Sequence, residues 1–207
     1  MTGVYDRRRM ITGNTIASGM KIIALKERGF RANGISSVRK SLAMRFGKEW
    51  WSNPDASDAI RAAAEPSVLY DRFLQHLNGW NSKQFEQLVK IHGIIHLSGG
   101  AFEGKLGHDV LFPRGLSAEI YNLWEPPPIM QSCADWRGMD DEGSYNTWNG
   151  GQGVLLIVSA DDVEWILWES SNWGIEALCS GEVVKRDEPF VRIQSKFAQG
   201  TEITYRS

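Results

Sequence analysis

Apolar side chains along the first hundred residues recur at the three- and four-residue spacing of an α-helix. The clearest stripe consists of Ile35, Val38, Leu42 and Phe46, which would share one helix face. A Pro at the start of a helix costs no hydrogen bond, so Asn53-Pro54-Asp55 indicates another helix start. Stripes of this kind predict helices over residues 16–29, 35–47, 53–65, 66–77 and 81–95.

The pattern changes after Ser98-Gly99-Gly100, where Gly, Pro and aromatic residues become frequent. Strand-like runs occupy residues 154–160, 163–169, 174–179, 182–186, 190–197 and 202–205. Asp161-Asp162 and Ser180-Gly181 stand where hairpin turns would be. Alternation along residues 163–169 places Trp165 and Trp168 on opposite faces, which indicates a central strand that is covered on both sides.

Together these patterns predict an α+β fold. We expect a bundle of about five helices, followed by a mainly antiparallel β part in the form of a meander or small curled sheet. We divide the chain into a basic helical domain (1–98) and an acidic, tryptophan-rich β domain (99–207) that packs against it.

Composition narrows the class of protein. A chain of 207 residues with 42% hydrophobic and 23% charged residues is ordinary for a globular protein. Its longest apolar runs, such as residues 154–158, fall far short of the roughly 20 residues that cross a bilayer. No apolar block of signal-peptide length follows the arginines near the N-terminus. Cys133 and Cys179 form no CxxC pair, so we expect a reducing, cytoplasmic setting and no membrane association.

Charge is divided unevenly along the chain. Residues 1–50 hold eleven basic and three acidic residues, a balance of +8, and the remainder has a balance of −10. Such asymmetry suggests an anionic partner such as nucleic acid for the basic part. Neutralisation of one half by the other, within the monomer or across a homodimer, explains the same division. The residues that would contact nucleic acid are Arg7, Arg8, Arg9, Arg31, Arg39, Lys40 and Arg45.

One local resemblance concerns the stretch from Ser37 to Trp51 (SVRKSLAMRFGKEWW), which resembles the opening helices of HEPN domains. These all-helical modules are common in prokaryotic defence systems and in RNA metabolism, and a late helix carries an Arg and a His for metal-independent RNA cleavage. Lys90 and His96 occupy the comparable places here, with Lys90 in place of the Arg and Ile91 in place of the usual Asn. The resemblance implies that His96 acts as general acid or base and that Lys90 stabilises phosphate charge. The departures from the motif favour a non-catalytic member.

His92 and His96 also lie four residues apart, at the spacing of two metal ligands on a helix. Glu103 or His108 would complete such a site. Both histidines fall on the apolar stripe, and the position of a zinc-protease general base is Gly93, so we expect histidines of a core or pocket, no metal and no cofactor.

The second half offers residues for a protein partner. Exposed aromatic residues in polar contexts are candidates for recognition or for anchoring of a loop, and acidic side chains cluster nearby. The candidate partner-binding residues are Trp136, Trp148, Trp173, Asp140 and Asp141.

Two functions remain open from the sequence. The first is a non-catalytic binding protein of a prokaryotic or phage conflict system, which acts as an inhibitor, immunity protein or complex subunit. It would bind a protein partner and dock on nucleic acid through its basic helices. The alternative is a HEPN-like protein that binds or cleaves RNA. Because no coherent catalytic set is visible, the sequence favours a protein that is not an enzyme.

Overall fold

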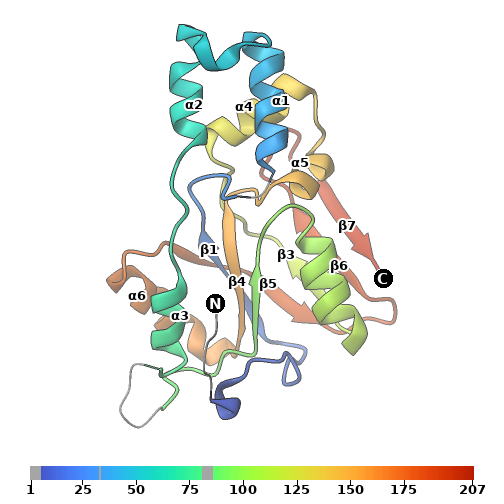
Figure 1. Cartoon of the computed structure of the whole chain (residues 1–207). Coiled ribbons are helices and arrows are strands. Elements are labelled where there is room, and N and C mark those ends of the chain that lie inside the picture. The colour runs from blue at the N-terminus through green and yellow to red at the C-terminus, as the bar shows by residue number, and fades with distance from the viewer. Residues whose placement is uncertain (1–5, 33, 81–85) are drawn as a thin grey trace.

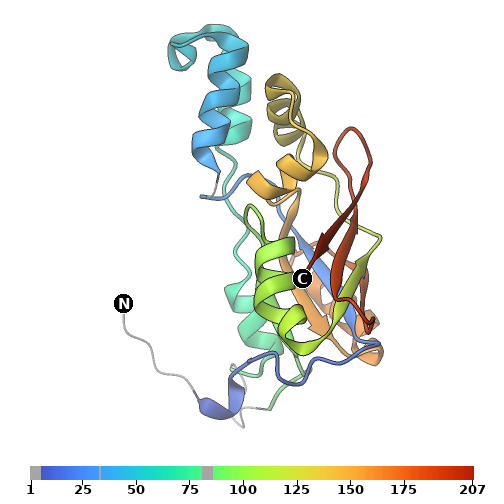
Figure 2. The ribbon, with the colours of Figure 1, turned by 90° about the vertical axis from the view of Figure 1, so that its right-hand side faces the viewer.

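Strand β1 (Lys21–Lys26) lies inside a seven-stranded mixed sheet with the order β2-β4-β1-β5-β3-β6-β7. The computed structural model describes residues 6–32, 34–80 and 86–207. The other strands are β2 (Gly93–His96), β3 (Ser117–Ile120), β4 (Gln152–Val158), β5 (Ala177–Val184), β6 (Phe190–Gln194) and β7 (Glu202–Arg206). Neighbouring strands are antiparallel except for β3 and β6, which are parallel. The sheet is curled into a half-barrel (Figure 2).

Both faces of the sheet are covered, as strand β4 demonstrates. Leu155 and Ile157 contribute to one apolar core, whereas Leu156 and Val158 contribute to another. The first core is closed by α1 (Ile35–Phe46), α4 (Pro128–Arg137) and the π-helix η4 (Phe102–Leu111). The second is closed by α3 (Asp71–Leu77) and α6 (Val163–Asn172). A strand that is buried on both faces has no polar alternation, which is why residues 154–158 of β4 are apolar throughout.

The helical arm consists of α1, the 3-10 turns η2 (Trp50–Ser52) and η3 (Pro54–Ala56), and α2 (Ser57–Ala63). It stands beside α4 at the top of Figure 1, at the opposite end of the molecule from η1 (Arg7–Arg9). The remaining elements are η5 (Phe112–Arg114), α5 (Asp141–Thr147) and η6 (Ala160–Asp162).

The predicted helical bundle followed by an antiparallel β part is wrong, although the helix over residues 35–47 is confirmed as α1. Residues 21–26 form a strand inside the sheet instead of the second half of a helix. Residues 93–96 form β2 at the edge of the sheet. Residues 163–169, expected as a central strand, lie within α6 (Val163–Asn172).

Short apolar runs explain these errors. Ile22-Ile23-Ala24-Leu25 is a continuous apolar segment rich in β-branched residues, and such a run suits a doubly covered strand as well as a helix. The spacing of Ile16, Met20 and Ile23 suggested a helix, but Ile16 and Met20 precede the strand and are not part of it. In α6 only Ile166 and Ser170 are buried, so its Trp165 and Trp168 are exposed helix positions and not two faces of a strand.

The division of the chain at residues 98 and 99 falls just after β2. Strands from both sides of that position share one sheet, with β1 hydrogen-bonded to β4 and β5. Within the described residues, the structure contains no helix both long and apolar enough to cross a membrane.

Candidate functional site

Three loops meet at one end of strands β1, β2 and β4. Strands β1 and β2 both pair antiparallel with β4, so the ends of β1 and β2 lie beside the start of β4. The loop after β1 carries Glu27 and Arg31, and the loop after β2 carries Ser98 and Gly99. The loop before β4 carries Trp148 and Asn149. Segments far apart in the sequence are therefore brought together at this end of the strands.

Buried side chains lock these loops to one another. Asn149 is buried and its Nδ2 donates to the Gly29 carbonyl at 2.9 Å. Trp148 is also buried; its Nε1 donates to the Gly34 carbonyl at 3.3 Å. Gly99 approaches so closely that a Cβ there would lie 2.4 Å from the Thr147 carbonyl oxygen. The rim of the site is thus held by packing before any ligand arrives.

The loops surround a hollow of about 360 Å³ that is lined by Arg31, Ala32, Ser67, His96 and Ser98. We call it the loop hollow. Lys105, from η4, reaches its edge and donates through Nζ to Ser98 Oγ at 2.9 Å and to the His96 carbonyl at 3.1 Å. The hollow therefore combines two cations, an imidazole and two hydroxyl groups.

Arg31 is held by a buried carboxylate. The Glu27 side chain is fully buried, and its Oε2 accepts from Arg31 Nη1 at 2.9 Å. Its Oε1 accepts from the backbone N–H groups of Arg28 and Val68 at 2.9 and 3.2 Å. Burial of such a carboxylate is tolerated only when it is fully hydrogen-bonded. The backbone of Arg31 is left-handed, with φ of 61°. This conformation costs a non-glycine residue energy and occurs often at functional sites.

Tyr70 completes the wall behind Arg31. Its hydroxyl donates to the Lys26 carbonyl at 2.5 Å, and the Arg31 guanidinium lies 5.6 Å from the centre of its ring. Burial, with the Glu27 carboxylate as a second cause, raises the pKa of the Tyr70 hydroxyl, so it stays a neutral donor.

The electrostatics of the loop hollow favour an anion. His96 is exposed, but its partial desolvation lowers its pKa, and the charges of Arg31 and Lys105 lower it further. Neutral at pH 7, His96 can donate or accept a single proton, while the two cations supply the positive charge. Arg suits phosphate and carboxylate groups because its fork of donors matches their oxygens. Within the described residues there is no cluster of three His, Cys, Asp or Glu side chains that could hold a metal.

The predicted catalytic pair, Lys90 and His96, does not share a helix face. His96 ends strand β2 and Lys90 precedes that strand. His92 is buried, with Nδ1 2.7 Å from Thr15 Oγ1. His108 packs edge-on against Phe112 on the π-helix.

The predicted nucleic-acid residues are distributed over three places. Arg7, Arg8 and Arg9 form η1, whereas Arg39, Lys40 and Arg45 belong to α1 at the other end of the molecule (Figure 1). Arg31 lies in the loop hollow. The structure therefore brings them together on no single surface.

The residues predicted to bind a partner have mostly internal contacts. Trp148 is buried beneath the loops, and Trp136 packs edge-on against Phe46. Trp173 is 39% exposed and donates to Glu169. Asp141 is buried and accepts from the backbone of Gln199 and Thr201, and Asp140 caps α5.

Sequence reasoning missed Glu27, Ser67, Ser98 and Lys105. The available signal was the pair Gly99-Gly100, separated by three residues from the apolar pair Ile94-Ile95, because glycines near a strand end permit close approach of backbone or ligand. The predicted helix over residues 81–95, of which 81–85 lie outside the described residues, concealed this signal.

No family model matches this chain. It is 30% identical over 191 residues to phosphoribosylformylglycinamidine cyclo-ligase of Prochlorococcus marinus (strain NATL2A), and the match covers 88% of this chain and 51% of the relative. The enzyme of the same name from Desulfotalea psychrophila is also 30% identical, over 91% of this chain and 51% of the relative. The chain spans about half the length of the curated relatives it matches.

Solved structures share the fold at low sequence identity. Thiamine-monophosphate kinase from Stenotrophomonas maltophilia has a TM-score of 0.56 at 13% identity, over 90% of this chain and 54% of that one. The HypE–HypF complex gives a TM-score of 0.52 at 14% identity, over 92% and 53%. PurL of T. maritima complexed with ATP gives 0.50 at 12% identity, over 95% and 27%. The fold is therefore PurM-like.

These findings correct the functional predictions. The resemblance to HEPN domains is wrong, since both sequence relatives and structural neighbours have a different fold. The predicted role in a phage or prokaryotic conflict system is contradicted, and so is the alternative of a HEPN-like ribonuclease. The expectation of a protein that is not an enzyme is also contradicted, because the relatives are named for an enzyme.

Proposed function

We propose that this chain forms part of an enzyme of the phosphoribosylformylglycinamidine cyclo-ligase type, with the loop hollow as the binding site for a phosphorylated substrate. The observation that carries the proposal is the pairing of Arg31 and Lys105 around the hydroxyls of Ser67 and Ser98. The relatives at 30% identity support it, because their name specifies a substrate that bears a phosphoribosyl group.

Each residue has a physical role in this proposal. Arg31 would donate to phosphate oxygens through guanidinium N–H groups other than the Nη1 that binds Glu27. Lys105 would supply charge at the far rim, as a compact ammonium group already directed at Ser98. His96, held neutral by its surroundings, would position a polar group of the substrate or transfer a proton to it.

A nucleotide and a second polypeptide region belong to the wider proposal. PurL, which shares the fold, has been solved with ATP, and HypE with HypF. We infer that a second region covers the open side of the loop hollow and provides the nucleotide site. A homodimer and a cytoplasmic location remain part of this proposal, and sedimentation velocity of the purified chain would test the dimer.

Calorimetric titration of the purified chain with ribose 5-phosphate and with ribose tests the loop hollow. We expect ribose 5-phosphate to bind and ribose not to bind measurably, because the site recognises the phosphate. Loss of a hydrogen bond to a charged group costs about 1.5–3 kcal/mol, so Arg31→Ala and Ser98→Ala should weaken binding by about tenfold or more.

Lys185→Ala is the matched control, since Lys185 is exposed at the end of β5 and away from the three loops. Because Arg31→Ala leaves the buried Glu27 without its ion-pair partner, Ser98→Ala keeps the test valid if the first variant unfolds. Equal affinity for ribose and ribose 5-phosphate, or unchanged affinity in Ser98→Ala and Arg31→Ala, would overturn the proposal.

A further inference from the structure

A second basic hollow lies on the helical arm, remote in the fold from the three loops. It is lined by Ser36, Arg39, Lys40, Ala43, Lys48, Trp50 and Trp51. We call it the arm hollow. Its lining contains three cations and no carboxylate, and within the described residues none of these three cations takes part in an ion pair. Three unneutralised cations around one depression favour an anionic ligand.

Two indole rings form the end of the arm hollow. Trp51 is 63% exposed, an unusual state for the largest apolar side chain. Its ring stands edge-on to that of Trp50, with centroids 5.8 Å apart, so Trp50 braces it. Ala43 on α1 also lines the hollow, with only a methyl group as its side chain. An exposed ring fixed by a neighbour is a ready stacking surface.

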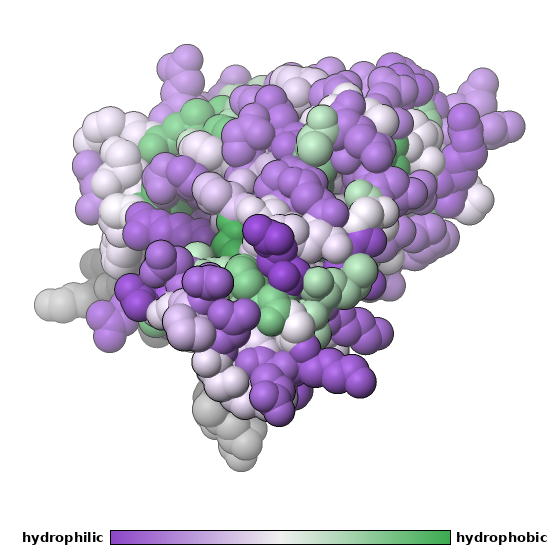
Figure 3. Space-filling view, turned by 90° about the horizontal axis from the view of Figure 1, so that it is seen from above, coloured by the Kyte–Doolittle hydropathy of each residue, from purple (hydrophilic) through white to green (hydrophobic). Residues whose placement is uncertain are grey.

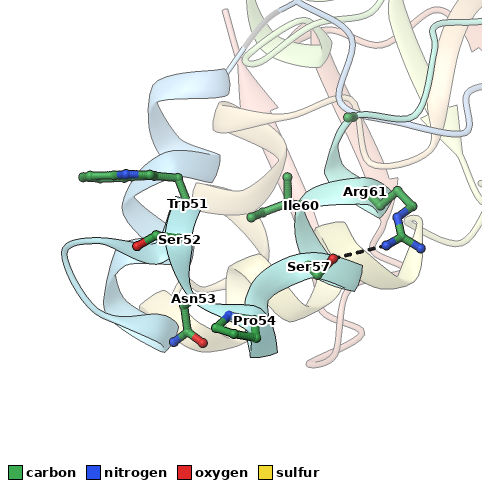
Figure 4. A pocket seen from close by; sticks show the side chains of 8 residues that line it. Trp51, Ser52, Asn53, Pro54, Ser57, Ile60 and Arg61 are labelled. Carbon is green, nitrogen blue, oxygen red and sulfur yellow. Dashed lines mark hydrogen bonds between the residues drawn. The ribbon is translucent and has the colours of Figure 1, made fainter.

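Trp51 also lines a second hollow, between the 3-10 turns and α2 (Figure 4). There Ser52, Asn53 and Pro54 lie opposite Ser57, Ile60 and Arg61. Arg61 is engaged, since it donates to Ser57 Oγ at 3.1 Å and pairs with Asp58. The view onto this end of the molecule shows separate hydrophobic patches among hydrophilic side chains (Figure 3). Trp51 is thus shared by the basic arm hollow and by a hollow whose single cation is already paired.

We propose that the helical arm binds a nucleoside diphosphate or triphosphate, with the phosphates in the arm hollow and the base stacked on Trp51. Arg39, Lys40 and Lys48 supply the charge that phosphate oxygens require, and the indole supplies a π-face that accepts any base. The site is separate from the loop hollow and does not depend on the function proposed for it. It would make the arm a sensor of nucleotide concentration.

Binding of ADP to the purified full chain tests the proposal. Titration calorimetry should show ADP binding at least tenfold more tightly than pyrophosphate or adenosine, because each of these offers only half of the recognised groups. Base stacking on an aromatic ring is worth about 1–3 kcal/mol, so Trp51→Ala should weaken ADP binding by about tenfold, while Trp51→Phe should keep most of it. Arg39→Ala combined with Lys40→Ala should weaken it further and reduce its dependence on salt.

Two controls separate this site from others. Trp168→Ala removes a tryptophan of similar exposure, 60%, from α6 and should leave ADP binding unchanged. Ser98→Ala alters the loop hollow and should also leave ADP binding unchanged.

Three outcomes would overturn the inference. The first is ADP binding that survives Trp51→Ala and the double variant, and the second is binding lost in Ser98→Ala instead. The third is pyrophosphate or a single-stranded oligonucleotide that binds more tightly than ADP.

Discussion

At the scale of single residues, close backbone approach decides where glycine is required. Gly99 leaves no space for a side chain, whereas a Cβ on Gly104, a few residues along on η4, would meet no atom within 4 Å. The two glycines therefore form a matched pair, in which one holds the loops of the site together and the other is free of packing constraints.

Gly99→Ala should destabilise the protein by about 1–3 kcal/mol, since the added methyl would force the loop away from the Thr147 carbonyl. Gly104→Ala should be neutral or slightly stabilising, because alanine lowers the entropy of the unfolded chain at no steric cost. Urea unfolding of both variants measures the difference. Equal stability of the two would show that the loops yield easily at Gly99.

His92 should make stability depend on pH. Burial lowers the pKa of His92 below its usual value of 6.5, with the charge of Lys90 as the next cause. The unfolded chain then binds more protons than the folded one below about pH 6.5, so the free energy of unfolding falls as the solution becomes acidic. The fall for one such histidine is at most about 1.4 kcal/mol per pH unit.

His92→Gln keeps a polar side chain opposite Thr15 and removes the titration. The variant should lose less stability than the wild type between pH 7 and pH 5.5, as measured by denaturant unfolding at each pH. A parallel loss in both proteins would contradict the assignment of this pH dependence to His92.

At the scale of elements, α3 and α6 are joined by one carboxylate. Glu169 on α6 lies 2.7 Å from His76 Nε2 on α3 and accepts from Trp173 Nε1 at 3.1 Å. Hydrogen bonds from Asn172, then from Trp173 and His76, lower the pKa of Glu169. Because the folded pKa is depressed, this stabilisation is present above the unfolded value of about 4.5 and is lost as pH falls through the folded value.

Glu169→Gln should destabilise the protein at pH 7 by about 1 kcal/mol, as for the loss of a charge-assisted hydrogen bond. Glu164→Gln, on the same helix, is the control, because Glu164 has no hydrogen bond or ion pair recorded in the described structure and should be nearly neutral. Thermal unfolding at pH 7 compares the two. Equal melting temperatures of the two variants would mean that the hydrogen bonds of Glu169 contribute nothing to stability.

The elements also show what the sequence could predict. Helix α1 was predictable because Ile35, Val38, Leu42 and Phe46 sustain the helical period over three turns, closed by Gly47. Strands β1 and β2 were not, since a run of four apolar residues suits either state and the pairing with β4 that decides it is remote in sequence. The loop hollow was out of reach for the same reason, because Arg31, Ser67 and Ser98 meet only through that pairing.

At the scale of the whole molecule, some of the basic residues in the first fifty are paired with acidic residues of the second half and others are not. Three cations in and beside β1 pair with acidic residues of the second half: Lys21 with Glu182, and Lys26 and Arg28 with Glu176. Internal neutralisation thus explains part of the basic excess. The cations of the arm hollow take part in no such pair among the described residues, and they are available to an external anion.

The same separation of sheet and arm predicts unequal local stability. Ile22–Leu25 of β1 and Leu155–Ile157 of β4 are fully buried at the centre of both cores, so their amides should exchange with solvent only through global unfolding. Helix α2 has no fully buried residue and makes its main contacts with η3, α1 and α4 at one end of the molecule, so its amides should exchange through local opening. Hydrogen exchange followed by mass spectrometry should show protection lost from α2 orders of magnitude sooner than from β1 and β4.

If ADP occupies the arm, its addition should slow exchange in α1 and α2 and leave β4 unchanged. Equal protection of α2 and β4 in the free protein would show that arm and sheet unfold as one cooperative unit.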